Sequence, residues 1–163
     1  KSNQDIELYK DSKKLSEAQR EILSESIHKN HFVSIGWSTV EEIDQINILQ
    51  ATFLAMRRAL EKVPVTFSKG AVLVDGRDVI PKLESFSQRA IIKGDQLVGE
   101  ISAASIVAKV ARDNFMKELS KEYVHYGFEK HKGYGTEFHR HQIQKFGVSK
   151  WHRQSFGGVK EFI

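Results

Sequence analysis

Apolar and polar positions along the first third of the chain predict two amphipathic helices. Ser16 and Gln19 have the spacing of a capping box, which predicts a helix from about Glu17 to His28. Thr39 and Glu42 form a second such pair. The helix that Thr39 opens has apolar residues at steps of three and four, which predicts one apolar face over about five turns. These residues are Ile43, Ile46, Leu49, Phe53, Met56 and Leu60.

Short runs of β-branched, aliphatic and aromatic residues predict strands between the helices. Residues 32–37 are rich enough in such side chains for a short strand. Residues 71–74 are continuously apolar and end abruptly at Asp75-Gly76, which is typical of a strand buried on both faces. Residues 88–93 predict a neighbouring strand that closes at Lys93-Gly94-Asp95.

The second half of the chain predicts further helices. A long helix is expected from about Leu97 to Tyr123, and its small residues allow close packing against a sheet. Another helix is expected to begin after Gly135-Thr136 and to stop at Gly147. The tail from Val148 to Ile163 has no clear period. Alternating strands and helices indicate the α/β class, and a length of 163 residues favours one domain.

Composition excludes several kinds of protein. The chain is 40% hydrophobic and 28% charged, which suits a folded domain with a core. No apolar run reaches the roughly 18 residues that a membrane-spanning helix needs, and no secretory signal opens the sequence. With no Cys there is no disulfide framework, thiolate zinc site or cysteine nucleophile. We therefore expect no membrane association and a cytoplasmic location.

Charge is unevenly distributed and points to a polyanionic partner. Residues 1–88 carry 12 basic and 13 acidic groups, whereas residues 89–163 carry 13 basic and 8 acidic groups. Aromatic and His side chains are interleaved with the basic ones in the second half. This pattern is typical of nucleic-acid binding, although an ordinary solvated basic surface fits it as well.

Asp75 and Asp95 are the leading candidates for chemistry. Each follows an apolar run that predicts a strand, and ligands of open α/β sheets gather beyond the carboxyl ends of strands. Two carboxylates at that edge suit Mg²⁺ or Mn²⁺, which prefer oxygen ligands. The alternative is that both residues only begin turns, because Asp-Gly and Gly-Asp are common turn pairs.

Two loops carry residues suited to contacting nucleic acid. Lys13 and Lys14 precede a predicted helix and could contact phosphates, or be an incidental basic pair on a solvated loop. Tyr134 lies between Gly133 and Gly135, where its ring could stack on a sugar or base. Its alternative role is to pack back onto the core. The seven His residues match no zinc spacing, and there is no phosphate-binding glycine loop or nucleophile elbow.

Seven segments in this order resemble the type 2 ribonucleases H, the ribonuclease HII family, over essentially the whole chain. The segments are Asp11-Ser-Lys-Lys-Leu-Ser16, residues 41–52 (EEIDQINILQAT), Val74-Asp-Gly76, Lys93-Gly-Asp95, residues 103–113 (AASIVAKVARD), Lys132-Gly-Tyr-Gly-Thr136, and His152-Arg153 with Ser155-Phe156. Single segments are weak signals, but their collinear order is specific.

The resemblance implies a fold and a reaction. The expected fold is a ribonuclease-H-like mixed sheet flanked by helices, as a single domain over residues 1–163 with a helical C-terminal segment at about 124–163. The expected enzyme is a metal-dependent endoribonuclease that cleaves the RNA strand of RNA–DNA hybrids. It is also expected to cut 5′ of ribonucleotides embedded in duplex DNA, leaving 3′-hydroxyl and 5′-phosphate ends. Hydrolysis would use two Mg²⁺ or Mn²⁺ ions.

The resemblance also implies roles for particular residues. Asp75 and Asp95 match two of the four metal-binding carboxylates of the family. Tyr134 matches the tyrosine that lies next to the ribonucleotide's 2′-hydroxyl, the group that separates RNA from DNA. Lys13 and Lys14 match positions near DNA phosphates, and we expect Lys93 to contact the nucleic acid too.

One family segment is not found in this sequence. The other two carboxylates belong to an Asp-Glu-x-Gly-Arg-Gly segment on the first strand, upstream of Asp11. Two carboxylates alone cannot easily hold two metal ions. Because the sequence begins at Lys1, we expect the natural protein to be longer and to carry this segment and its strand. The alternatives are a truncated or catalytically inactive relative that binds nucleic acid without cutting, and an interaction domain with no nucleic-acid partner. We expect a monomer.

Overall fold

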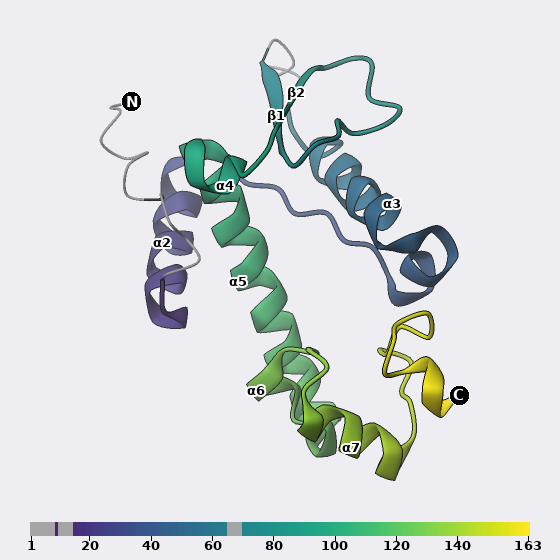
Figure 1. Ribbon diagram of the computed structural model, residues 1–163. Helices are drawn as coiled ribbons and strands as arrows, with labels where there is room; N and C mark the ends of the chain where they lie inside the picture. The colour runs from purple at the N-terminus through teal and green to yellow at the C-terminus, as the bar shows by residue number, and fades with distance from the viewer. Residues whose placement is uncertain (1–8, 10–14, 65–69) are drawn as a thin grey trace. The chain divides into compact units, whose positions relative to one another are not determined.

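The computed structural model describes residues 9, 15–64 and 70–163. Most of the described elements are helices, and two short strands form one small sheet (Figure 1). The α/β class is therefore confirmed, with the expected sheet represented in the described residues by one parallel pair. In chain order the elements are α2 (Glu17–Asn30), α3 (Val40–Leu60), β1 (Ala71–Asp75), β2 (Ser87–Ile91), α4 (Gly94–Leu97), α5 (Gly99–Glu122), η3 (Val124–Tyr126), α6 (Phe128–His131), α7 (Glu137–Phe146) and η4 (Lys160–Phe162).

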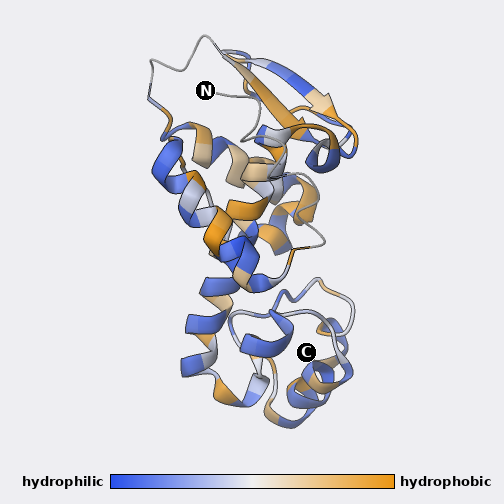
Figure 2. Cartoon of the chain, turned by 90° about the vertical axis from the view of Figure 1, so that its left-hand side faces the viewer, coloured by the Kyte–Doolittle hydropathy of each residue, from blue (hydrophilic) through white to orange (hydrophobic). Residues whose placement is uncertain are grey.

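The two predicted strands β1 and β2 are confirmed and pair in parallel. The register places Ala71 opposite Ser87 and Asp75 opposite Ile91. Figure 2 shows β1 as hydrophobic almost to its end, whereas β2 is hydrophilic over its first residues. In β1 only Val74 is buried, so the expectation of burial on both faces is wrong for most of this strand. Asp75, the last residue of β1, is exposed.

Both capping boxes form as predicted. The Ser16 N–H donates to Gln19 Oε1 at 2.8 Å, and the Gln19 N–H donates to Ser16 Oγ at 3.3 Å. Thr39 and Glu42 make the same reciprocal pair at 2.8 and 3.2 Å. These local bonds satisfy amide donors that a helix start otherwise leaves without partners.

The strand predicted at residues 32–37 is wrong. This segment has no regular secondary structure, and no strand in the described residues pairs with it. Side chains from the C-terminal end of α3 and just after it donate hydrogen bonds to its carbonyl groups instead. Arg58 Nη1 donates to Trp37 O and Lys62 Nζ donates to Ile35 O, both at 2.7 Å. A high β-propensity does not produce a strand unless a neighbouring strand is available for backbone hydrogen bonds.

The helix predicted from Thr39 to Leu60 is broken at Asn47, where φ is 67° and ψ is 165°. Asn47 Oδ1 accepts from the Leu49 and Gln50 N–H groups at 3.0 and 3.1 Å, so it caps the second part of α3. The expected single apolar face is therefore also wrong. Phe53 is buried, whereas Leu49 is half exposed.

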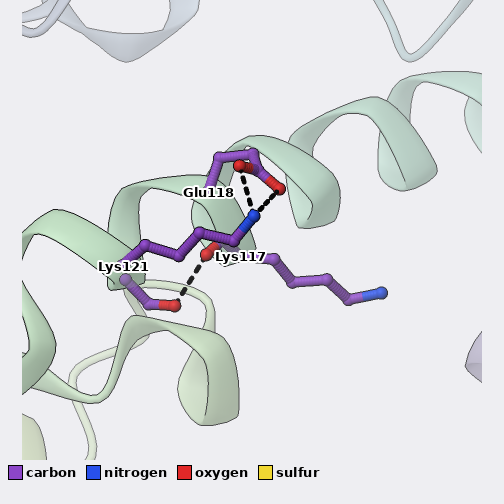
Figure 3. A network of polar contacts seen from close by, with 4 residues as sticks. Lys117, Glu118 and Lys121 are labelled. Atoms are coloured by element: carbon purple, nitrogen blue, oxygen red, sulfur yellow. Dashed lines mark hydrogen bonds and ion pairs between the residues drawn. The ribbon is translucent and has the colours of Figure 1, made fainter.

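The helix predicted from about Leu97 to Tyr123 is confirmed as α5, and Val98, which has extended backbone, separates it from the short α4. Near the end of α5, Lys121 Nζ lies 2.8 and 2.7 Å from the two carboxylate oxygens of Glu118 (Figure 3). Both side chains are about 70% exposed, so this pair adds little stability.

No helix in the described residues offers a stretch long and apolar enough to cross a bilayer.

The chain forms two compact units. Unit 1 comprises residues 1–37 and 53–110, and unit 2 comprises residues 38–52 and 111–163. Unit 1 has two apolar clusters. One contains Tyr9, Ile27, Ile106 and Val107, and the other contains Phe53, Val74 and Ile80. The core of unit 2 comprises Met116, Leu119, Tyr126, Phe128, Ile143 and Val159.

Unit 2 confirms the predicted helix between Thr136 and Gly147. Thr136 Oγ1 accepts from the His139 N–H at 3.2 Å and so caps α7. Gly147, at φ 81°, ends this helix. The Gly147 carbonyl accepts from the Tyr126 hydroxyl at 2.8 Å, which ties the end of α7 to the core of the unit.

Gly36 is expected to be the position in unit 1 least tolerant of a side chain. A Cβ there would lie 1.9 Å from Ala55 O and 2.6 Å from Ala59 N, both backbone atoms of α3. Because backbone cannot give way like a side chain, Gly36→Ala should lower the free energy of unfolding by about 3 kcal/mol. Urea unfolding measures this. Gly157→Ala is the control, because nothing lies within 4 Å of its Cβ position. Equal stability of the two variants would contradict the packing.

Candidate functional site

Asp75 and Asp95 lie at the same end of the parallel pair in unit 1. Asp75 is the last residue of β1 and faces Ile91, the last residue of β2. Asp95 follows a few residues later, in the first turn of α4. Parallel strands end at one edge of a sheet, so the structure brings both aspartates to the edge expected from the sequence.

A backbone bond organises this edge. The Gly94 N–H donates to Asp75 Oδ1 at 2.8 Å, which joins the end of β1 to the start of α4. Gly94 has little room for a side chain, because a Cβ would lie 2.6 Å from Ile101 Cδ1. Oδ2 of the exposed Asp75 has no hydrogen-bond partner among the described residues. Asp95, by contrast, is only 4% exposed.

The donor chemistry at this edge fits a hard divalent cation, because carboxylate oxygens are the ligands that Mg²⁺ and Mn²⁺ prefer. No group of three His, Cys, Asp or Glu side chains suited to one metal ion occurs within residues 9, 15–64 and 70–163. Asp75 and Asp95 would thus be part of a ligand set. The alternative role of both residues, that of turn formers, is equally compatible with the Gly94 bond.

Of the three lysines predicted to contact nucleic acid, the structure describes Lys93. Lys93 lies directly before α4 in left-handed backbone, with φ 56°, and its side chain is exposed. It therefore lies beside the aspartate edge, and its contact with nucleic acid stays a prediction. Lys13 and Lys14 lie outside the described residues.

Tyr134 lies on the loop before α7 in unit 2. Its side chain is 62% exposed, so it does not pack into the core. The guanidinium carbon of Arg112 lies 5.6 Å from the centre of the Tyr134 ring. An exposed ring beside a cation suits stacking against a sugar or base next to a phosphate.

A second guanidinium belongs to this region of unit 2. Arg153 lies 4.4 Å from the centre of the Phe156 ring. Burial, and then repulsion from Arg112, lower the pKa of Arg153, while Asp44 opposes them. Asp44 also accepts from the Gln154 and Ser155 N–H groups at 2.8 and 3.0 Å, which fixes the segment that carries Arg153. Two cations that repel each other favour an anion between them.

Three buried histidines form a cluster that sequence analysis missed. His139 Nε2 lies 3.0 Å from His152 Nε2, and the rings of His131 and His139 stack with centroids 4.3 Å apart. Burial is the main cause that lowers the pKa of His139, and it lowers the pKa of His152 to about 4. His131 and His139 lie close together in the sequence, but no sequence signal links either of them to His152.

Comparison with known proteins gives a consistent result. The family model described as ribonuclease HII matches residues 5–159. The ribonuclease HII of Pelagibacter ubique (strain HTCC1062) is 44% identical over 159 residues, which cover 98% of this chain and 84% of that protein. The crystal structure of ribonuclease H2 from Pyrococcus horikoshii OT3 has a TM-score of 0.71 at 25% identity, covering 98% of this chain and 81% of that one.

A further structure supports the fold. The complex of PCNA and ribonuclease HII from Archaeoglobus fulgidus has a TM-score of 0.67 at 22% identity, covering 93% of this chain and 79% of that one. The expected ribonuclease-H-like fold is therefore confirmed.

The buried histidines predict a loss of stability in acid. An unfolded His titrates near pH 6.5, whereas His152 in the folded protein titrates at about 4. Between these values the unfolded state binds more protons, so the free energy of unfolding should fall as the pH drops from 6.5 to 4. The contribution of His152 is at most about 3 kcal/mol. Urea unfolding from pH 7 to pH 4 measures it, with His152→Gln as the comparison. An unchanged pH dependence in that variant would contradict the assignment.

Proposed function

This chain belongs to the ribonuclease HII family, whose members are hydrolytic endoribonucleases, and we propose that it cleaves the RNA strand of RNA–DNA hybrids. The proposal extends to DNA duplexes with embedded ribonucleotides, which the protein would cut on the 5′ side. The products would carry 3′-hydroxyl and 5′-phosphate ends.

One observation carries this proposal more than any other. Asp75 and Asp95 lie at the carboxyl edge of the β1–β2 pair, where α/β proteins bind ligands. The family generally depends on divalent metal ions, and we infer that these two carboxylates would help to hold Mg²⁺ or Mn²⁺, two ions in the full site. Such ions would activate a water molecule and stabilise the leaving oxygen.

The chain's own residues would orient the site. The Gly94 N–H fixes Asp75 through Oδ1, and the second oxygen of this carboxylate remains available. Asp95 is held in the first turn of α4 with little exposure. Side chains fixed in this way lower the cost of assembling a metal site.

Unit 2 would contribute recognition. Tyr134 offers an exposed ring for the ribose whose 2′-hydroxyl distinguishes RNA from DNA. Arg112 and Arg153 add positive charge suited to phosphates, and the excess of basic residues in the second half of the chain supports this role.

A nucleic-acid-binding protein without nuclease activity is the other candidate. It is favoured by the excess of basic residues in the second half of the chain, which suits binding to a polyanion. Both candidates would bind hybrid duplex in a salt-sensitive manner. Only the nuclease would cut the duplex, so cleavage distinguishes the two.

The test is cleavage of a labelled DNA duplex with one ribonucleotide by the full encoded protein. Under Mg²⁺ we expect a nick 5′ of the ribonucleotide, and none with a chelator. Asp75→Asn and Asp95→Asn should each lower the rate by roughly a thousandfold, because a metal-binding carboxylate is lost. Circular dichroism checks that both variants remain folded.

Asp78→Asn is the matched control, because Asp78 is an exposed aspartate just beyond β1. It should cut at the rate of the unmodified protein. Full activity of Asp75→Asn or Asp95→Asn would remove that residue from the site. Binding without cutting under either Mg²⁺ or Mn²⁺ would favour the non-catalytic candidate.

A further inference from the structure

Three histidines in unit 2 are buried among aromatic side chains. His131, His139 and His152 are 8%, 4% and 5% exposed. Their rings contact those of Tyr126 and Phe128 at centroid distances of 4.8 to 6.5 Å. Polar groups that are buried this deeply cost free energy unless they are hydrogen-bonded. The use of His in place of Phe therefore points to the bonds that the ring nitrogens make.

Those bonds fix the position of each ring proton. The Ser149 N–H donates to His152 Nδ1 at 2.9 Å, and Ser149 Oγ lies 2.8 Å from the same nitrogen. Because a backbone N–H can only donate, Nδ1 acts as the acceptor and the proton of neutral His152 is on Nε2. His152 Nε2–H then donates to His139 Nε2 at 3.0 Å. As a result, His139 carries its proton on Nδ1 and donates to the Tyr134 carbonyl at 3.0 Å.

The relay ends at the residue proposed to contact the ribose. The Tyr134 carbonyl accepts from His139 Nδ1 and also from the Thr136 N–H at 2.8 Å. On the other side, the Gly133 N–H donates to His131 Nδ1 at 3.2 Å, and His131 Nε2–H donates to the Tyr126 carbonyl at 2.7 Å. Buried imidazoles thus hold the backbone on both sides of Tyr134, although its own ring is exposed.

The relay also requires the neutral form of both rings. A proton added to His139 would go to Nε2 and place N–H against the His152 Nε2–H across the 3.0 Å contact. A proton added to His152 would go to Nδ1 and place N–H against the Ser149 N–H. Desolvation of both rings acts in the same direction and keeps them neutral.

We propose that His139 and His152 are positioning residues, a relay of neutral imidazoles that runs from the Ser149 amide to the Tyr134 carbonyl and orients the Tyr134 ring toward the ribonucleotide. This proposal rests on the proposed function, in which Tyr134 contacts the ribose. If the histidines served only to fill the core, the direction of their hydrogen bonds would not matter. The last bond of the series would also not need to reach the Tyr134 carbonyl.

The first test is a double-mutant cycle on cleavage of a duplex with one ribonucleotide. His139→Phe keeps an aromatic ring but removes the donor to Tyr134. It should lower kcat/KM by roughly ten- to a hundredfold, the usual effect of misplacing a group that contacts substrate. In a Tyr134→Ala background the same change should cost less than about twofold, because the residue through which the relay acts is gone.

Two further variants separate positioning from packing. His139→Asn places an amide donor where Nδ1 lies, so it should recover much of the activity that His139→Phe loses. His141→Phe makes the same substitution at an exposed position of α7 and should leave kcat/KM unchanged. Equal losses from His139→Phe in both Tyr134 backgrounds would overturn the proposal.

The second test needs no variant. In ¹⁵N NMR of the imidazole rings at pH 7, His152 should be the neutral Nε2–H tautomer and His139 the neutral Nδ1–H tautomer. The opposite tautomer at either ring, or a charged ring, would overturn the relay. Failure of the proposed function gives results distinct from failure of the relay. The unmodified protein would not cut the duplex, or Tyr134→Ala would cut it normally. Neither result depends on the tautomers of His139 and His152.

Discussion

The parallel pairing of β1 with β2 is the constraint on which the proposed catalytic site depends. Its register sets Asp75 opposite Ile91, and the chain then needs only a short turn to bring Asp95 to the same edge. The Gly94 N–H closes this arrangement on Asp75 Oδ1 at 2.8 Å. A shift of β1 by one residue would point the Asp75 side chain to the other face of the sheet, because side chains alternate along a strand. The pairing thus links an apolar sequence run to a pair of carboxylates.

Features that arise from local contacts could be predicted from the sequence. The capping boxes at Ser16 and Thr39, the end of β1 at Asp75, and the limits of α7 each depend on residues within a few positions of one another. The strand expected at residues 32–37 fails because a strand requires a partner elsewhere in the chain, and this segment binds side chains of α3 instead. The break in α3 had a local signal, since Asn is a good cap and tolerates positive φ.

The candidate site was predictable in its residue types but not in its supporting contacts. Asp75, Asp95 and Tyr134 stand out because of flanking glycines and the strands or helix beside them. The relay behind Tyr134 was not predictable, because His152 meets His139 only through the packing of the C-terminal segment. The same packing brings Arg153 under the electrostatic influence of Arg112. Each unit therefore combines an exposed candidate side chain with hydrogen bonds that hold its backbone or carboxylate in place.

The central claim is that Asp75 and Asp95 together bind a divalent cation, and anomalous diffraction tests it most directly. Crystals of the full encoded protein soaked in Mn²⁺ would be measured on either side of the manganese absorption edge. If both carboxylates bind the ion, we expect an anomalous peak at about 2.0–2.3 Å from carboxylate oxygens of Asp75 and of Asp95, the range expected for such a cation. A peak that contacts neither carboxylate, or no peak at this edge of the sheet at saturating Mn²⁺, would contradict it.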